Sequence, residues 1–182
     1  AAAARAPRRR AHRGSTTVTL PPKESASDAS SPAVAGPTRL RRLRFPAGFA
    51  VLHVEDDGVL RKSMALRVFK RMGVPFDAAK DGKEAIDRVL GLGEFEAAGP
   101  RAYGLVLMDN QMPGISGAKT TRALRDAGYD GPIIGMTGDP MGCPERNEFE
   151  AAGLSVCVDK DNSGIARILE EIRAHALDGE DA

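Results

Sequence analysis

Two parts of opposite charge make up the 182-residue chain. Residues 1–45 carry ten Lys or Arg residues against two acidic residues, a net charge of +8, whereas residues 46–182 carry 16 basic and 23 acidic residues, a net charge of −7. This length suits one domain with a tail, and excludes two ordinary domains. Cys143 and Cys157 are too few for a disulfide framework and lack metal-ligand spacing, and no apolar run approaches the roughly 18 residues of a membrane helix.

The first 47 residues are rich in Ala, Arg, Ser and Pro and show no sustained apolar period, which predicts a disordered basic tail. Acidic residues are absent before Glu24, so organelle targeting stays open beside the intracellular, cytoplasmic location that the cysteine usage favours. Aromatic residues are absent before Phe45, so we expect no dedicated nucleic-acid site. Residues 177–182 form a short acidic tail.

The body alternates short apolar runs with stretches of helical periodicity. The runs predict buried strands at 49–54, 103–108, 132–136 and 154–158, with a weaker candidate at 75–79. Helical spacing joins Leu60, Met64 and Val68, Asp81 with Glu84 predicts a helix start, and a last amphipathic helix begins near Ile165. The order predicts a flavodoxin-like, doubly wound sheet of five parallel strands with five flanking helices. Its ligand site is expected beyond the carboxyl ends of the strands.

Polar residues follow four of the predicted strands. Glu55, Asp56 and Asp57 follow the first strand, Asp109 follows "LVLM", Thr137 ends the fourth strand, and Lys160 follows the fifth. Neighbouring carboxylates repel one another, and a hard divalent cation such as Mg²⁺ relieves this repulsion. A cation, a hydroxyl and an ammonium around Asp109 suit a phosphoryl group. We therefore expect Asp109 to attack phosphorus and form an acyl phosphate, with Glu55 and Asp56 as metal ligands.

Five segments, "VLHVEDD", "DGKEA", "LVLMDNQMPGISG", "IIGMTGD" and "VDK", resemble in this order the receiver domain of two-component response regulators, over residues 48–176. The resemblance implies a phosphorelay in which Asp109 accepts phosphate from a histidine kinase or a histidine phosphotransfer protein. It implies that Glu55, Asp56, Asp109 and the backbone carbonyl of Gln111 hold Mg²⁺. It also implies that Thr137 and Lys160 bind the phosphoryl oxygens, that no separate substrate is turned over, and that the domain is a monomer or weak dimer.

Two positions depart from the family pattern. Asp161 follows the conserved lysine where receivers usually have proline, and Cys157 stands where the family commonly has the Tyr or Phe of its conformational switch. These departures favour an alternative, a pseudo-receiver that binds a partner without phosphorylation. A haloacid dehalogenase-type hydrolase is a weaker rival, because that class requires a second aspartate where this chain has Gln111. A stand-alone receiver and the receiver end of a hybrid kinase both fit the sequence.

Overall fold

The computed structural model describes residues 42–177, so most of the predicted basic tail (1–47) and acidic tail (177–182) lies outside the described residues. Five parallel strands form one sheet in the order β2-β1-β3-β4-β5. The strands are β1 Val51–Val54, β2 Phe76–Ala79, β3 Leu105–Asp109, β4 Ile133–Thr137 and β5 Val156–Asp159. This topology confirms the predicted flavodoxin-like fold. The strand order reverses between β1 and β3, so a cleft for a ligand is expected beyond their carboxyl ends.

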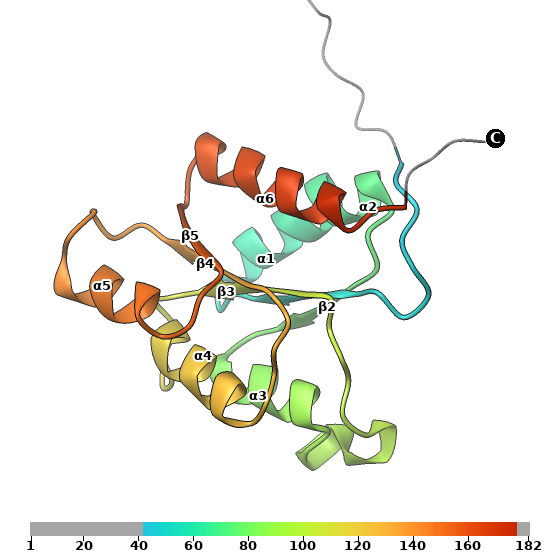
Figure 1. The fold of residues 1–182 in the computed structure, drawn as a ribbon, viewed down its shortest axis with the longest axis horizontal. Coiled ribbons are helices and arrows are strands. Elements are labelled where there is room, and N and C mark those ends of the chain that lie inside the picture. Colours follow the sequence, from blue (N-terminus) through green and yellow to red (C-terminus); the bar gives the residue numbers. More distant parts are fainter. Residues whose placement is uncertain (1–41, 178–182) are drawn as a thin grey trace, which may run out of the picture. The chain divides into compact units, whose positions relative to one another are not determined.

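Helices cover both faces of the sheet (Figure 1). One face carries α6 (Asn162–Ala174) and a long helix made of α1 (Gly58–Met64), the π-helical turn η1 (Ala65–Phe69) and α2 (Lys70–Met72). The opposite face carries α3 (Gly82–Leu90), α4 (Gly117–Asp126) and α5 (Pro144–Glu150). A short 3₁₀ helix, η2 (Gly93–Ala98), precedes β3. None of the helices in the described part is both long and apolar enough to cross a membrane.

The two faces of the sheet have separate cores, which explains why the strands are apolar at nearly every position. Along β3, Leu105 and Leu107 belong to the core under α1 and α6, whereas Val106 and Met108 belong to the core under α3, α4 and α5. All four side chains are fully buried. Burial of each such side chain stabilises the fold by about 1.5–3 kcal/mol.

Residues at the edge of the predicted basic tail lie against the core under α6. Leu43 donates its amide N–H to the carbonyl of Met72 over 2.7 Å, and the Phe45 ring stacks on Phe49 with ring centroids 4.9 Å apart. Leu43 and Phe45 are both packed against this core. The chain is therefore held in place several residues before β1 begins.

Helix α3 begins as the sequence predicts. The Asp81 carboxylate accepts a hydrogen bond from the amide of Glu84 over 2.8 Å, which satisfies one of the free N–H groups of the first turn. The Glu84 carboxylate in turn accepts from the amide of Lys80 over 3.1 Å, one residue earlier than a standard capping box would place this bond.

The turn from β3 to α4 explains the glycine that closes the "DNQMPGISG" segment. Gly117 is the first residue of α4, and its amide donates to the carbonyl of Asn110 over 2.9 Å. A Cβ atom at this position would overlap the carbonyl oxygen of Asp109 and lie 2.8 Å from the Cα atom of Asn110. The atoms that the Cβ would meet belong to the backbone and cannot rotate away. The start of α4 is therefore packed directly on the end of β3, which fixes the backbone of Asp109.

We expect Gly117→Ala to destabilise the domain by about 1–3 kcal/mol, because the added methyl group overpacks a backbone contact. Gly58→Ala is the matched control, since Gly58 also opens a helix but a Cβ there would meet only an Arg61 side-chain atom at 3.8 Å. Urea unfolding monitored by circular dichroism measures both variants. Equal stabilities of the two variants would contradict the proposed packing.

Candidate phosphoacceptor site

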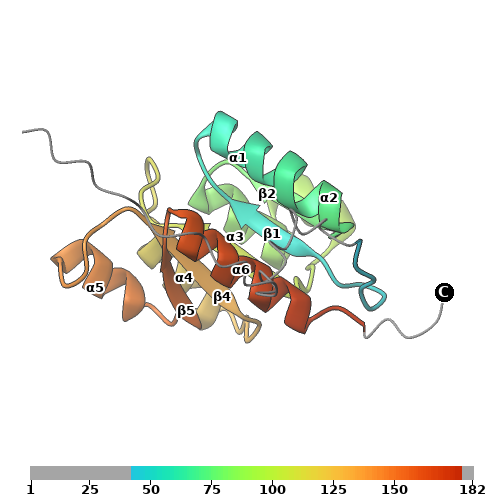
Figure 2. The same cartoon turned by 90° about the horizontal axis from the view of Figure 1, so that it is seen from above.

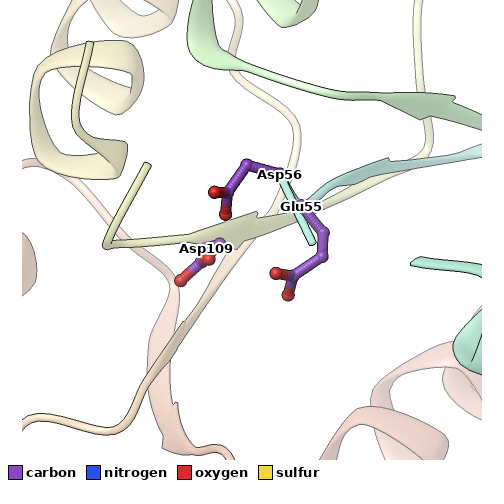
Figure 3. Close-up of side chains that lie close together, drawn as sticks. All are labelled: Glu55, Asp56 and Asp109. Carbon is purple, nitrogen blue, oxygen red and sulfur yellow. The ribbon is translucent and has the colours of Figure 1, made fainter. Parts of the chain in front are cut away.

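Three carboxylates meet at the carboxyl ends of β1 and β3 (Figure 3). The register pairs Val54 with Met108, so Glu55 follows β1 directly beside Asp109, the last residue of β3. The carboxylate oxygens of Glu55, Asp56 and Asp109 lie within 4.8 Å of one another. Glu55 and Asp109 are buried, whereas Asp56 is exposed. The structure thus brings together the three acids that the sequence predicts as metal ligands.

Lys160 lies between the two buried acids. The Nζ atom is 2.9 Å from Asp109 Oδ2 and 3.1 Å from Glu55 Oε2. The backbone of Lys160 is fixed by an amide hydrogen bond of 2.9 Å to the carbonyl of Thr137, which extends the pairing of β5 with β4. Burial opposes the ammonium charge, but the hydrogen bonds and charges of Asp109 and Glu55 outweigh it and raise the pKa of Lys160 above its ordinary value.

The pKa of Glu55 reflects both its burial and its acidic neighbour. Burial, and then the charge of Asp109, raise the pKa of the Glu55 carboxyl, although Lys160 acts in the opposite direction. Three carboxylates lie around one ammonium, so the acids at this site outnumber its lysine. An all-oxygen donor set of this kind fits a hard divalent cation such as Mg²⁺. The residues present are thus suited to the ion that the sequence predicts.

The third acid after β1 has a structural role that the sequence did not reveal. Asp57 is the N-cap of α1, and its carboxylate accepts hydrogen bonds from the amides of Val59 over 2.7 Å and Leu60 over 3.0 Å. These two hydrogen bonds, with that of Leu60 the larger influence, lower the pKa of Asp57. The side chain is committed to the helix start, which separates it from its two acidic neighbours.

Thr137 and Gln111 are joined through a residue outside the predicted set. The Thr137 hydroxyl donates to Asp139 Oδ2 over 2.8 Å, and the Gln111 side-chain amide donates to Asp139 Oδ1 over 2.5 Å. Asn110 Nδ2 also donates to Asp139 over 3.1 Å. The Gln111 backbone N–H donates to Asp109 Oδ1 over 3.1 Å, which turns the loop after β3 back over the carboxylate. Asp139 thus accepts hydrogen bonds from two residues of the loop after β3 and from the last residue of β4.

The structure shows the surroundings of both departures from the family pattern, Asp161 and Cys157. Asp161 is the N-cap of α6 and accepts from the amide of Gly164 over 2.8 Å, and the peptide bonds in residues 42–177 are all trans. Near Cys157, the buried guanidinium of Arg146 donates to Glu150 over 2.8 Å, to Asp159 over 2.5 Å and to the carbonyl of Asp139 over 3.1 Å. The side-chain hydrogen bonds to Glu150 and then Asp159 raise the pKa of Arg146.

The predicted metal ligands and phosphoryl-binding residues include neither Asp139 nor Arg146, although the family resemblance places Asp139, like Gln111, at a position that tunes the lifetime of the phosphoryl group. Asp139 stands two residues after β4, so the same inspection of strand ends that selected Thr137 could have included it. Arg146 carries no comparable signal, because an arginine in a short helix is ordinarily exposed and this one has only 4% of its surface accessible.

Known proteins support the family suggested by this geometry. The response regulator receiver domain model matches residues 51–173. Histidine kinase CKI1 of Arabidopsis thaliana is 33% identical over 71% of this chain, although the match spans only 12% of the kinase. Two-component response regulator 24 of the same plant is 32% identical over 56% of this chain and 67% of that protein.

Solved structures agree with the sequence relatives. The receiver domain of Arabidopsis thaliana CKI1, crystallised with Mg²⁺, is 31% identical, has a TM-score of 0.56, and matches over 72% of this chain and 96% of that one. The chemotaxis protein CheY4 of Vibrio cholerae, at 21% identity and a TM-score of 0.54, supports the fold over 69% of this chain and 99% of that one. Because the family model spans almost the whole described body, from β1 to α6, the chain belongs to the response regulator receiver domain family of two-component signalling.

Proposed function

We propose that this chain is a phosphoacceptor in which Asp109 takes a phosphoryl group from the phosphohistidine of a histidine kinase or histidine phosphotransfer protein. The observation that carries the proposal is the buried Asp109 carboxylate, which ends the central strand 2.9 Å from Lys160 Nζ. In the reaction, a carboxylate oxygen forms a bond to phosphorus. The P–N bond to the donor imidazole breaks, with its electron pair passing to nitrogen, and the product is an acyl phosphate.

The surrounding residues have different roles in this transfer. Lys160 neutralises charge on the phosphoryl oxygens, and the Thr137 hydroxyl donates to one of them after it leaves Asp139. Glu55, Asp56, Asp109 and the backbone carbonyl of Gln111 would hold Mg²⁺. When bound, the ion supplies positive charge that offsets the negative charge of the acids and of the phosphoryl oxygens.

The proposed acceptor site also determines the domain bounds and the phosphoryl donor that we propose. The receiver domain occupies residues 48–176, between a basic tail and a short acidic tail, and it assists its own phosphorylation without turning over a separate substrate. A kinase and response regulators among its relatives support a phosphorelay with a histidine kinase or phosphotransfer protein as donor. A pseudo-receiver that binds partners without phosphorylation is the alternative, because Cys157 replaces the usual switch residue.

Incubation with acetyl phosphate and Mg²⁺ is expected to add about 80 Da to the intact mass, the mass of one phosphoryl group. Asp109→Asn should abolish the addition, since an amide oxygen is a poor nucleophile. Asp57→Asn is the matched control, because Asn also caps helices well and the residue lies outside the proposed acceptor set. An unchanged mass in folded wild-type protein would favour the pseudo-receiver, and an addition that survives in Asp109→Asn would place the acceptor elsewhere.

Mg²⁺ is expected to raise the melting temperature by several degrees, because it relieves the repulsion among the three acids. At about one hundred times its dissociation constant, a ligand adds about 2.7 kcal/mol to the stability of the form that binds it. Differential scanning calorimetry with and without Mg²⁺ measures the effect. Asp56→Asn should lose most of the increase and Asp57→Asn should keep it. An equal increase in both variants would show that the ion binds outside this site.

Removing Asp139 is expected to speed phosphorylation by acetyl phosphate about tenfold. Asp139→Ala frees the Thr137 hydroxyl from a hydrogen bond to a charged acceptor, a bond worth about 1.5–3 kcal/mol, and removes a negative charge beside the phosphoryl group. The rate of mass addition measures the change, with the exposed Asp126→Ala as control. A slower or unchanged rate would mean that Thr137 is not restrained by Asp139 during transfer.

A further inference from the structure

Arg146 of α5 is a buried cation beside the carboxyl ends of β4 and β5. Helix α5 lies next to β5, the edge strand of the sheet (Figure 2). The Arg146 side chain has only 4% of its surface accessible, although arginine is almost never fully buried unless it is paired. The positions of its partners in the chain therefore indicate what this guanidinium holds in place.

Two partners of Arg146 are close in sequence to the residues proposed to bind the phosphoryl group. The Nη1 atom donates to the carbonyl oxygen of Asp139 over 3.1 Å, and Asp139 comes two residues after Thr137. The same atom donates to Oδ1 of Asp159 over 2.5 Å, and Asp159 immediately precedes Lys160. Thr137 and Asp159 are register partners across the β4–β5 pair. Arg146 thus connects the backbone that carries Thr137 to the backbone that carries Lys160.

The third partner fixes the direction in which the guanidinium points. Arg146 Nε donates to Glu150 Oε1 over 2.8 Å, one turn further along α5. A guanidinium is planar and its N–H donors form a rigid fork, so a hydrogen bond at Nε also restricts the position of Nη1. Helix α5 therefore presents Nη1 to both strand ends in one orientation.

Hydrogen bonds continue from these two contacts to the acceptor carboxylate. The Asp139 amide donates to Thr137 Oγ1 over 3.0 Å, and the Lys160 amide donates to the Thr137 carbonyl over 2.9 Å. Lys160 Nζ in turn lies 2.9 Å from Asp109 Oδ2. A shift of either backbone segment would thus move a hydroxyl or an ammonium relative to Asp109. Misplacement of a reacting or binding group by about 1 Å can slow a reaction about 100-fold.

We propose that Arg146 is a positioning residue, which holds Thr137 and Lys160 in the geometry required for phosphoryl transfer to Asp109. It acts through the carbonyl of Asp139 and the carboxylate of Asp159. This role rests on the proposed function, because it concerns the rate of that transfer. It is distinct from the effect of Asp139→Ala, since that change removes the carboxylate beside Thr137 but keeps the carbonyl that Arg146 holds.

The rate of mass addition from acetyl phosphate and Mg²⁺ is the first measurement. Arg146→Gln should slow it about tenfold, the effect of one lost hydrogen bond to a charged group. Arg146→Lys keeps the charge but lacks the fork, so it should recover only part of the loss. Arg122→Gln is the matched control and should keep the wild-type rate. Arg122 also pairs with an acid of α5, Glu148, over 2.9 Å, but it is exposed and its hydrogen bonds within residues 42–177 go only to Glu148.

A double variant tests whether Arg146 acts through Asp159. Asp159→Ala alone should slow the addition several-fold. If the two side chains form one unit, the combined variant Arg146→Gln/Asp159→Ala should be about as slow as Arg146→Gln alone. Independent effects would multiply instead.

Hydrogen exchange followed by NMR, without metal or phosphoryl donor, separates local positioning from overall stability. Arg146→Gln should speed exchange at the Lys160 amide about tenfold more than at the Val106 amide, which donates to the Pro132 carbonyl in the centre of the sheet over 2.9 Å. A variant that only lowered the overall stability would speed exchange at Val106 at least as much as at Lys160.

Three results would overturn the proposal: a wild-type rate in folded Arg146→Gln, the same slowing in Arg122→Gln, or no preferential exchange at Lys160. Circular dichroism checks the folding of each variant, and Arg146→Lys carries the same comparisons if Arg146→Gln does not fold. Absence of mass addition in the wild-type chain would instead be a failure of the proposed function. The exchange experiment would then still decide whether Arg146 holds the backbone of Lys160.

Discussion

The burial of two carboxylates beside each other is the constraint on which the site depends. Glu55 and Asp109 stand at the ends of neighbouring parallel strands, and a single lysine from β5 lies between them. Like charges in a buried position oppose folding, so the rest of the domain must hold them there. The hydrophobic cores on the two faces of the sheet supply that stability. This group of oxygen ligands could hold a hard cation, which is the arrangement on which the proposed phosphoryl transfer depends.

The backbone around Asp109 shows how the fold limits movement at this point. Gly117 allows α4 to begin in contact with the last peptide of β3, and the amide of Gln111 returns to the Asp109 carboxylate. The carboxylate is therefore held by elements before and after it in the chain. The sheet face under α1 and α6 is not completely filled, since a cavity remains between these two helices. One domain thus combines a carboxylate held by the backbone around it with an open apolar groove.

The sequence predicted the fold well because its signals are local and repeated. Apolar runs mark the strands, and the residues just after them mark the site, so Glu55, Asp56, Asp109, Thr137 and Lys160 could all be named and are found at one edge of the sheet. The contacts of Asp139 and Arg146 could not be derived in this way. They depend on how the loop after β4 meets α5 and β5, which is tertiary packing without a periodic pattern. The capping roles of Asp57 and Asp161 were not predicted either, because an aspartate just before a helix can equally be an exposed residue of a loop.

The buried guanidinium of Arg146 gives α5 an unusual attachment. It connects this helix to the loop at Asp139 and to Asp159 on β5, beside the small side chain of Cys157. Its two carboxylate partners, Glu150 and Asp159, are 42% and 53% exposed, so water and dissolved ions reach them. Salt mainly screens charges that lie more than about 10 Å apart at 0.1 M, and it screens partly buried pairs much less, so these contacts of 2.5–2.8 Å persist in salt. The hold of the sheet on α5 in this domain consequently depends on directed hydrogen bonds, which a ring at position 157 would not supply.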